Sequence, residues 1–241
     1  MTRTLIDADY YLYRSATANE YEVEISPDIW TYLVRIDQAK ADFTDLMAGF
    51  ESLVNNGEIV LCLGDRTNFR YAVFPDYNAS RRKYRRPAGL NAIREWASQT
   101  WPTIVLPNTE GDDVIGVSAG PDDVIVSNDK DLRTIPGRHL DGELVVEVTQ
   151  WEADFTFYTQ VLTGDATDGY PGCKGTGPVA ARKALNGCQS EPEMWLAVLQ
   201  AYIKAGHTVD FAVRMARCAR ILRPGEYDHN KKTPVLWCPP A

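Results

Sequence analysis

Cysteine and histidine motifs that bind metals are missing from this 241-residue sequence. Its five cysteines are odd in number and show no CxxC spacing, so they indicate reduced thiols instead of a zinc site or a disulfide framework. The three histidines are scattered without an HExxH pair, which gives zinc hydrolysis little support. No apolar run approaches the ~18 residues of a membrane span, and the first residues lack the apolar core of a secretory signal. We therefore expect a cytoplasmic protein without membrane association.

Basic residues are scarce relative to acidic ones. The chain has 33 aspartates and glutamates against 25 lysines and arginines, for a net charge of −8. Taken alone, this balance argues against a general nucleic-acid binder. The distribution matters more than the total, because many acids fall in short clusters while residues 81–86 hold five bases in the run RRKYRR. If the clustered acids face metal ions, the remaining surface is close to neutral.

Carboxylates follow apolar segments at five places along the chain. The nine acids concerned are Asp7, Asp65, Glu110, Asp112, Asp113, Asp129, Asp131, Asp165 and Asp168. The carboxyl ends of parallel strands meet at one edge of a sheet, so we expect these side chains to gather there. Without cations they would repel one another, and hard divalent ions with oxygen ligands are the usual remedy. An ordinary turn or helix cap explains any single acid better, but five clusters in order favour a metal site.

Alternation of apolar strands and helical segments in the first 150 residues predicts an α/β fold with a parallel sheet. The expected strands are 4–6, 58–63, 103–106 and 123–126, and the expected helices are 91–101 and 112–119. Another helix is predicted over 27–55, with Ser26 as its N-cap and Pro27 in its first position. After residue 150 we expect helices over 151–162, 178–185, 191–205 and 208–222 and an extended tail over 234–241, with a capping box from Ser190 to Glu193 and Thr208 as an N-cap.

Two further segments could bind phosphates. The glycine-rich turn 172–178 opens a predicted helix soon after Asp168, and backbone amides at a helix start bind phosphate. Residues 75–89 are strongly basic, have aromatic residues close by, and are expected to form an exposed loop or a mobile basic helix. Either segment alone is commonly a solvated loop. Beside a metal site, both favour a nucleic-acid clamp.

The ordered motifs resemble the flap endonuclease/5′→3′ exonuclease family. The matching segments are Leu-Ile-Asp7, Gly-Asp65, Glu110-Gly-Asp-Asp-Val, Asp129-Lys-Asp-Leu and Gly-Asp165-Ala-Thr-Asp-Gly-Tyr-Pro-Gly. Phe-Pro-Asp-Tyr77-Asn-Ala-Ser-Arg81 is similar to the arch motif of that family, and residues 172–185 are similar to its helix–three-turn–helix DNA grip. The likeness is strongest to the 5′→3′ exonucleases of T-odd podophages and extends over nearly the whole chain.

The resemblance implies a PIN-like 5′-nuclease fold, with a mostly parallel central sheet flanked by helices and a helical arch at 75–89. Residues 1–150 would form the nuclease core and residues 151–241 a helical duplex-binding region, packed together as one catalytic unit. The implied activity is Mg²⁺-dependent 5′→3′ hydrolysis of duplex DNA without sequence specificity, with flap cleavage and RNase H-like removal of primers from RNA–DNA hybrids. Its place would be phage DNA replication, recombination and host DNA degradation, in the host cytoplasm beside phage replication proteins.

Site residues follow from the same resemblance. Asp65, Glu110 and Asp112 would hold a first metal ion, with Asp7 and Asp113 nearby or acting through water. Asp129, Asp131 and Asp165 would hold a second, supported by Asp168. Both ions would be Mg²⁺, with Mn²⁺ as a substitute, and K⁺ would bind at the glycine turn. The catalytic group would comprise Arg81, Lys83, Asp7 and Asp113. DNA would contact Tyr77, Arg81, Arg82, Lys83, Arg85, Arg86, Gly172, Lys174, Gly175, Gly177, Arg182 and Lys183.

Two positions depart from the family pattern. Asn78 stands where the arch motif usually has a lysine, so Lys83 or Arg82 would have to supply that cation. Val179 also replaces a usual lysine, and phosphate contact there would shift to Arg182 or Lys183.

Three other interpretations stay open. Asp7-Ala-Asp9 and residues 164–168 imitate motifs of haloacid dehalogenase-type phosphatases, which would leave residues 110–113 and the basic segment unexplained. A PIN-type ribonuclease would share the fold and metal chemistry but usually lacks the helical DNA grip. An inactive structure-specific DNA-binding protein would have to keep its buried acids without metal, which is costly.

Overall fold

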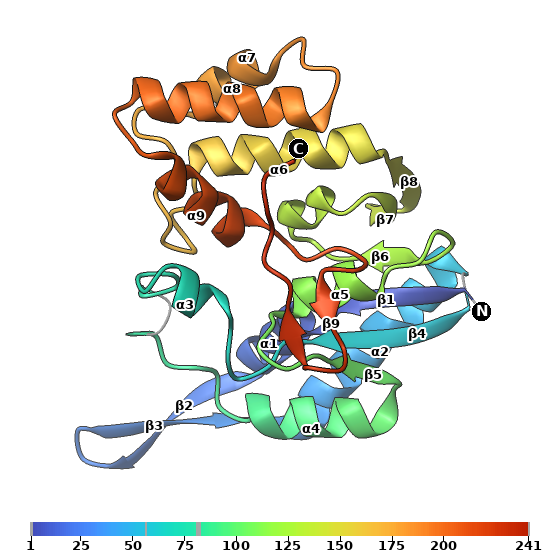
Figure 1. Cartoon of the computed structure of the whole chain (residues 1–241). Helices are drawn as coiled ribbons and strands as arrows, with labels where there is room; N and C mark the ends of the chain where they lie inside the picture. The colour runs from blue at the N-terminus through green and yellow to red at the C-terminus, as the bar shows by residue number, and fades with distance from the viewer. Residues whose placement is uncertain (1, 56, 81–82, 241) are drawn as a thin grey trace.

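The computed structural model describes residues 2–55, 57–80 and 83–240, and its centre is a six-stranded sheet in the order β5-β4-β1-β6-β7-β8 (Figure 1). The strands are β1 (Arg3–Asp7), β4 (Glu58–Leu63), β5 (Thr103–Val105), β6 (Val124–Val126), β7 (Gly137–Asp141) and β8 (Leu144–Val148). All neighbours run parallel except β7 and β8. The expected mostly parallel sheet is therefore confirmed, although the β7–β8 hairpin was not among the predicted elements.

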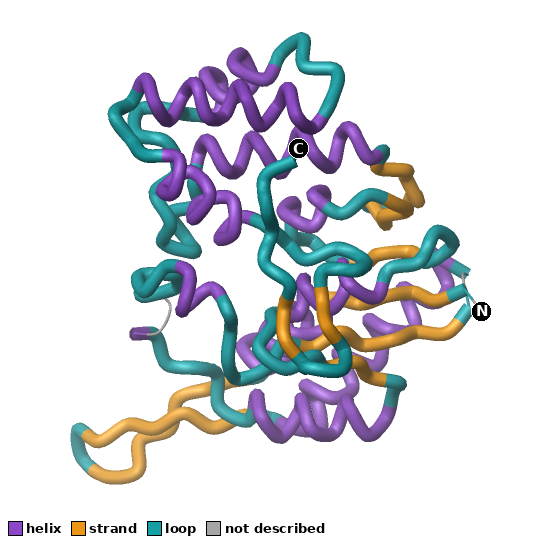
Figure 2. The backbone as a smooth tube through the Cα atoms, viewed as in Figure 1, coloured by secondary structure: helices purple, strands orange, loops and turns teal. Residues whose placement is uncertain are grey.

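Helices cover both faces of this sheet (Figure 2). On one face α1 (Ala8–Ala18), α2 (Ile36–Val54) and α4 (Leu90–Thr100) share a core with Ile6, Leu61 and Val126. On the other face α5 (Gly111–Ser118) packs with Leu5, Val60 and Ile125. Residues 4–7 of β1 are all buried without alternation, as expected of a central parallel strand that is covered on both faces.

The helix predicted over 27–55 is wrong in its first part. Residues 20–34 form a projecting hairpin of β2 (Glu20–Ser26) and β3 (Ile29–Val34), and α2 begins only at Ile36 (Figure 1). Ser26 and Pro27 belong to the end of β2 and the hairpin turn instead of capping a helix. The alternating glutamates of residues 20–24 and the aromatic and β-branched residues of 29–34 are strand signals that override a helical interpretation.

The C-terminal region is helical, as the sequence predicted, with its own apolar core around Phe157, Val161 and Met215. Its helices are α6 (Gln150–Thr163), α7 (Pro178–Leu185), α8 (Glu191–Lys204) and α9 (Val209–Ala219). Thr208 caps α9 as expected, since its side chain accepts a hydrogen bond from the Phe211 amide.

Two predicted details of this region are wrong. The Ser190 side chain forms no cap with the residues described, and Glu193 accepts from the Gln189 amide, so the expected capping box does not form. Helix α9 ends at Ala219 instead of 222, and the chain then returns to the core through β9 (Tyr227–Asp228) and β10 (Thr233–Pro234).

The segment expected to form an arch follows the four-residue helix α3 (Arg70–Val73). Within residues 75–80 and 83–89 the backbone forms turns and irregular stretches, with Lys83 in 3₁₀ conformation. Most of these residues are exposed, but Tyr77, Asn78 and Pro87 are buried, so the expected exposed loop is confirmed only in part. The expected helical arch falls partly on Arg81 and Arg82, which lie outside the described residues. Among the residues described, no helix has both the length and the apolar content needed to cross a bilayer.

Candidate metal centre

The acidic edge of the sheet is built around β1, where the strand order reverses. Strands β4 and β5 lie on one side of β1 and β6 lies on the other, and such a switch point is where open α/β sheets bind ligands. Asp7 ends β1, and Ser127, which follows β6, donates a hydrogen bond to Asp7 Oδ2 over 2.7 Å. Asp9 accepts from the Gly64 amide and pairs with Arg94 of α4, so it fixes the turn that leads to Asp65.

Three acids gather at the first turn of α5. Glu110, Asp112 and Asp113 each place one carboxylate oxygen within 4.8 Å of the others. Glu110 is the N-cap, and it forms a capping box with Asp113. Negative charge is favoured at a helix N-terminus, which explains why the chain can concentrate carboxylates here. Glu110 and Asp112 remain partly accessible and can face a cation.

A second acidic group forms between β6 and α6 and in the loop after α6. Asp129 caps the short 3₁₀ helix Lys130–Thr134, and its Oδ1 accepts from the Asp131 amide over 2.9 Å. Asp165 Oδ1 accepts from the amides of Thr167 and Asp168, which shapes the loop after α6. Burial, together with the charges of Asp129 and Asp165, raises the pKa of Asp131 to about 6. These acids therefore interact although they are far apart in the sequence.

Burial, neighbouring charges and hydrogen bonds change the pKa of several of these carboxyl groups. Burial raises the pKa of Asp7 to about 6, and the charges of Asp9 and Asp129 add to the effect. Burial and the neighbouring Asp113 and Glu110 raise the pKa of Asp112 well above its ordinary value. Asp65 differs, because hydrogen bonds from the Asn108 amide and the Thr67 hydroxyl lower its pKa. An ionised cluster without cations is thus unfavourable.

These shifts predict how pH changes metal binding. Asp7 and Asp131 keep their protons in the folded chain at pH values where the unfolded chain has lost them, so metal-free stability should fall as pH rises from about 4 through 6. A divalent ion requires ionised carboxylates, so its binding should strengthen over the same range. We expect Mg²⁺ to raise the melting temperature more at about pH 7.5 than at about pH 5, as measured by scanning calorimetry. An equal rise at both pH values would contradict this electrostatic description.

Tyr77 lies inside the protein and joins the two acidic groups. Its hydroxyl lies 3.0 Å from Glu110 Oε2 and 3.2 Å from Asp168 Oδ2. The residue is only 2% exposed, and its ring stacks on that of Tyr170. A buried ring cannot stack on an incoming base, so the predicted DNA contact of Tyr77 is wrong. The structure instead gives this residue a role in orienting carboxylates.

Asn78 contacts the same acids at the position where the family usually has lysine. Its φ is 54°, its Nδ2 donates to Glu110 Oε1 over 3.3 Å, and its buried Oδ1 has no hydrogen-bond partner among the described residues. An unpartnered amide oxygen beside partly accessible carboxylates is a donor set that suits a hard divalent cation. The residues present therefore fit the expected metal chemistry.

Asp113 is the most enclosed of the three acids at the start of α5. It is fully buried, and its two oxygens accept hydrogen bonds from Arg70, from the Glu110 amide and from the Leu222 amide. Its oxygens thus hold Arg70 and the start of α5 in place, and the metal-binding and catalytic roles predicted for Asp113 stay predictions. Arg70, its partner, was not among the predicted site residues, and no sequence motif marks it.

The glycine turn divides into a packed part and an open part. Gly172 is buried with φ at 64°, and a Cβ there would lie 2.2 Å from the Gly164 nitrogen. Packing therefore requires a glycine at position 172, and the DNA contact predicted for this buried residue stays a prediction. Gly175 and Gly177 have open space around them, and the side chains of Lys174, Arg182 and Lys183 are exposed. The predicted DNA contacts of these five residues stay predictions.

The basic segment is described only in part, because Arg81 and Arg82 lie outside the described residues. Lys83, Arg85 and Arg86 are exposed. Arg85 forms an ion pair with Glu20 at the base of the β2–β3 hairpin, and its guanidinium lies 3.8 Å from the centre of the Tyr32 ring. The segment is therefore anchored to the hairpin through one of its own arginines.

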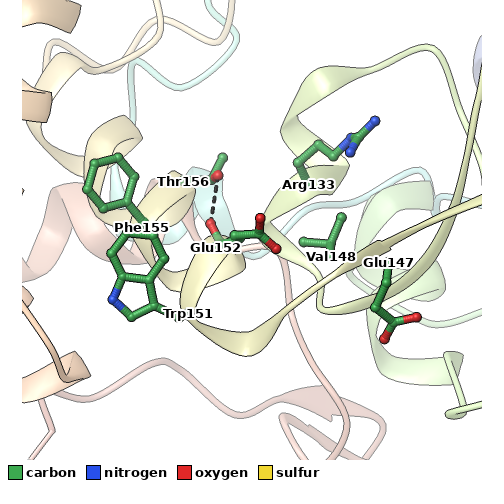
Figure 3. A pocket seen from close by; sticks show the side chains of 7 residues that line it. All are labelled: Arg133, Glu147, Val148, Trp151, Glu152, Phe155 and Thr156. Atoms are coloured by element: carbon green, nitrogen blue, oxygen red, sulfur yellow. Dashed lines mark hydrogen bonds between the residues drawn. The ribbon is translucent and has the colours of Figure 1, made fainter.

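A shallow surface pocket lies apart from the predicted acids (Figure 3). Its lining residues are Arg133, Glu147, Val148, Trp151, Glu152, Phe155 and Thr156. Trp151 stacks on Phe155, Thr156 donates to the Glu152 carbonyl, and Arg133 pairs with Asp141. These contacts account for most of the lining groups, and the nine predicted acids all lie outside the pocket lining.

The sheet order, the acidic edge and the helical C-terminal region together define a PIN-like 5′-nuclease fold. Solved structures with this fold include the T5 D15 protein co-crystallised with metal ions, which covers 91% of this chain and 93% of its own at 13% identity and a TM-score of 0.56. The catalytic core of Rad2 in complex with a DNA substrate covers 98% of this chain and 83% of its own at 16% identity and a TM-score of 0.52.

Sequence comparison identifies the relatives more narrowly. The exonuclease of Escherichia phage T7 is 28% identical over 98% of this chain and 93% of that protein. The exodeoxyribonuclease of Enterobacteria phage T3 is 26% identical over 98% of this chain and 92% of that protein. No protein-family model matches the chain. The predicted resemblance to the flap endonuclease/5′→3′ exonuclease family is thereby confirmed.

Proposed function

We propose that this chain is a divalent metal-dependent 5′→3′ exonuclease that hydrolyses duplex DNA without sequence specificity. The observation that carries the proposal is the convergence of two carboxylate groups, one at the start of α5 and one around Asp131 and Asp168, through the hydroxyl of Tyr77. Phage exonucleases that match nearly the whole chain support the assignment.

The first ion would be held by Glu110 and Asp112, with Asp65 and Asp7 nearby, and the second by Asp129, Asp131 and Asp165, with Asp168 in support. Mg²⁺ suits these oxygen donors, and Mn²⁺ would substitute for it. When bound, such ions activate water and stabilise the leaving oxygen in phosphodiester cleavage. The chain's own part is to keep the carboxylates oriented, which Tyr77, Asn78 and Ser127 do through hydrogen bonds.

The DNA would lie across the acidic edge and the open part of the glycine turn. Residues 151–241 would grip the duplex through Lys174, Arg182 and Lys183, with K⁺ as an additional ligand of the turn. Lys83, Arg86 and the undescribed Arg81 and Arg82 would contact phosphates near the cut, with Arg85 beside them. Flaps and RNA–DNA hybrids would be further substrates, and the place of action would be the phage-infected cell, beside phage replication proteins.

A haloacid dehalogenase-type phosphatase is less well supported. Such an enzyme would use Asp7 as a nucleophile, yet Asp7 is 9% exposed and accepts the hydrogen bond from Ser127. The acids at the start of α5 and around Asp131 would also have no function in it.

The open glycines allow a direct test of the DNA grip. Gly177 is the N-cap of α7 with φ at −88°, and apart from its chain neighbours no described residue has an atom within 4 Å of where an alanine Cβ would stand. Gly177→Ala should therefore create no clash and should lower the melting temperature only by the small cost of a weaker N-cap. If a phosphate approaches this backbone, the added methyl group should weaken duplex binding by about fivefold, the equivalent of one hydrogen bond. Fluorescence anisotropy in EDTA measures the affinity for duplex DNA. The control is Gly49→Ala in α2, a position that also has open space around it. Equal affinity of the two variants would remove Gly177 from the interface.

A test of the whole proposal compares linear and covalently closed circular duplexes of one sequence. With Mg²⁺ the chain should degrade the linear duplex and leave the circle intact, because the circle offers no 5′ end. With EDTA neither should change. Degradation of both forms at similar rates, or cleavage in EDTA, would overturn the proposal.

A further inference from the structure

Arg70 is a buried cation whose whole guanidinium is used. The residue is 1% exposed, and each of its nitrogens has partners within hydrogen-bond distance. Nη1 donates to Glu110 Oε2 over 3.0 Å and to Asp113 Oδ2 over 2.6 Å, and Nη2 donates to Asp113 Oδ1 over 2.8 Å. Nε donates to the carbonyl of Cys218 over 2.9 Å, and Nη2 also donates to that of Arg220 over 2.5 Å. Five donors thus meet five acceptors.

These contacts connect the metal centre with the helical region. Glu110 and Asp113 lie at the start of α5, whereas Cys218 and Arg220 lie at the end of α9. The Leu222 amide strengthens the same junction by donating to Asp113 Oδ1 over 3.0 Å. The orphan carbonyls at a helix C-terminus favour a cation, so Arg70 satisfies both elements at once.

We propose that Arg70, together with Asp113, is a positioning residue that fixes Glu110 for divalent metal binding and couples that site to the end of α9. The pair carries no net charge, because the Arg70 cation is matched by the Asp113 carboxylate. Its effect on metal binding therefore comes from geometry. Arg70 Nη1 donates to Oε2 of Glu110, and Asn78 Nδ2 donates to Oε1, so both carboxylate oxygens are held in place. This inference rests on the proposed function only in placing a metal ion at Glu110 and Asp112.

Only an arginine can make this set of contacts. A lysine would keep the charge but has three donors on one nitrogen, so it cannot bind Asp113 through two atoms and also reach both carbonyls. Substituting groups that orient metal ligands typically lowers metal affinity by about 10–100-fold. Arg70→Lys consequently separates the contribution of orientation from that of charge.

The experiment is isothermal titration calorimetry of the full chain with Mn²⁺ and with Mg²⁺, in the absence of DNA. Arg70→Lys should weaken binding by about tenfold or more. The control is Arg3→Lys, because Arg3 similarly binds an aspartate, Asp123, and a carbonyl, that of Ser118, at the opposite end of β1. Both variants should lower the melting temperature, but Arg3→Lys should bind metal as the unmodified chain does. Unchanged or tighter metal binding by Arg70→Lys would overturn the proposal.

A second measurement needs no variant and keeps the proposal testable if Arg70→Lys does not fold. Hydrogen exchange of the unmodified chain should show that Mn²⁺ slows amide exchange at residues 218–222, because Glu110 is tied to this segment through Arg70. The hairpin 20–34 should show no change. Protection absent from 218–222 while metal binds would overturn the coupling. Neither measurement depends on cleavage of DNA. A chain that binds metal but does not cut DNA would therefore contradict the proposed function without contradicting this inference.

Discussion

Replacing Asp112 by asparagine should abolish most metal-dependent cleavage and at the same time stabilise the metal-free protein. Asp112 is a partly accessible carboxylate beside Glu110 and Asp113, and we propose that it binds the ion directly. Losing such a ligand should cost more than the ~10–100-fold typical of residues that only orient ligands. We therefore expect turnover to fall by more than about 100-fold. Asparagine keeps the shape of the side chain, so the loss would reflect charge and coordination.

The expected stabilisation of the metal-free protein follows from the raised pKa of Asp112. Burial, Asp113 and Glu110 raise the pKa of Asp112 well above its ordinary value, so its ionised form destabilises the folded chain at neutral pH. The asparagine side chain cannot ionise, and the free energy of unfolding in EDTA should therefore rise at about pH 7.5. The gain should disappear at acidic pH, where Asp112 is protonated in both states.

Asp123→Asn is a matched control, for which the expected change in stability has the opposite sign. Although burial raises the pKa of Asp123, hydrogen bonds from Arg3 and the Gly120 amide outweigh it and lower that pKa. Asp123→Asn should therefore destabilise the chain at neutral pH without affecting cleavage through the metal ligands. If Asp112→Asn destabilised the metal-free chain as Asp123→Asn does, the cluster would not be electrostatically strained.

Replacing Gly172 by alanine should cost about 3 kcal/mol or more of folding free energy. Its φ of 64° is unfavourable for a residue with a Cβ, and that Cβ would lie 2.2 Å from the Gly164 nitrogen and 2.5 Å from the Thr163 carbonyl carbon. Both neighbours are backbone atoms, so no side chain can move aside to relieve the clash. Urea unfolding of the full chain measures the loss.

Gly175→Ala separates strain from clash in the same turn. Gly175 has φ at 78° but open space around it, so alanine there should cost only the roughly 1–2 kcal/mol of a left-handed backbone conformation. Similar losses for the two variants would mean that the packing of Gly172 against Gly164 contributes little to stability.

The sequence predicted the sheet centre and the acidic edge because both depend on local signals. Runs such as 58–63 are too short and too apolar for a surface helix, and an acid after such a run must lie at a strand end. The β2–β3 hairpin was missed because its turn, Ser26-Pro27-Asp28, also matches the start of a helix. These residues are typical both of a hairpin turn and of a helix start. Only the alternating pattern of the strands on either side distinguishes the two structures.

Neighbouring residues of one type could not be distinguished from sequence. Asp112 and Asp113 are adjacent, yet they point about 100° apart around the first turn of α5, so one is accessible and the other is enclosed by Arg70. Gly172 and Gly177 differ in the same way, one packed on Gly164 and one open. Arg70 and Tyr77 acquire their roles only through contacts with residues 33 to 150 positions away in the chain.

The most direct measurement of the central claim follows the two ends of one linear duplex. Duplexes labelled at the 5′ or at the 3′ end are incubated with Mg²⁺ and either the unmodified chain or Asp112→Asn. A 5′→3′ nuclease with these metal ligands should release the 5′ label at once and the 3′ label only late, and the variant should release neither at a comparable rate. Early release of the 3′ label, or full activity of Asp112→Asn, would contradict this assignment.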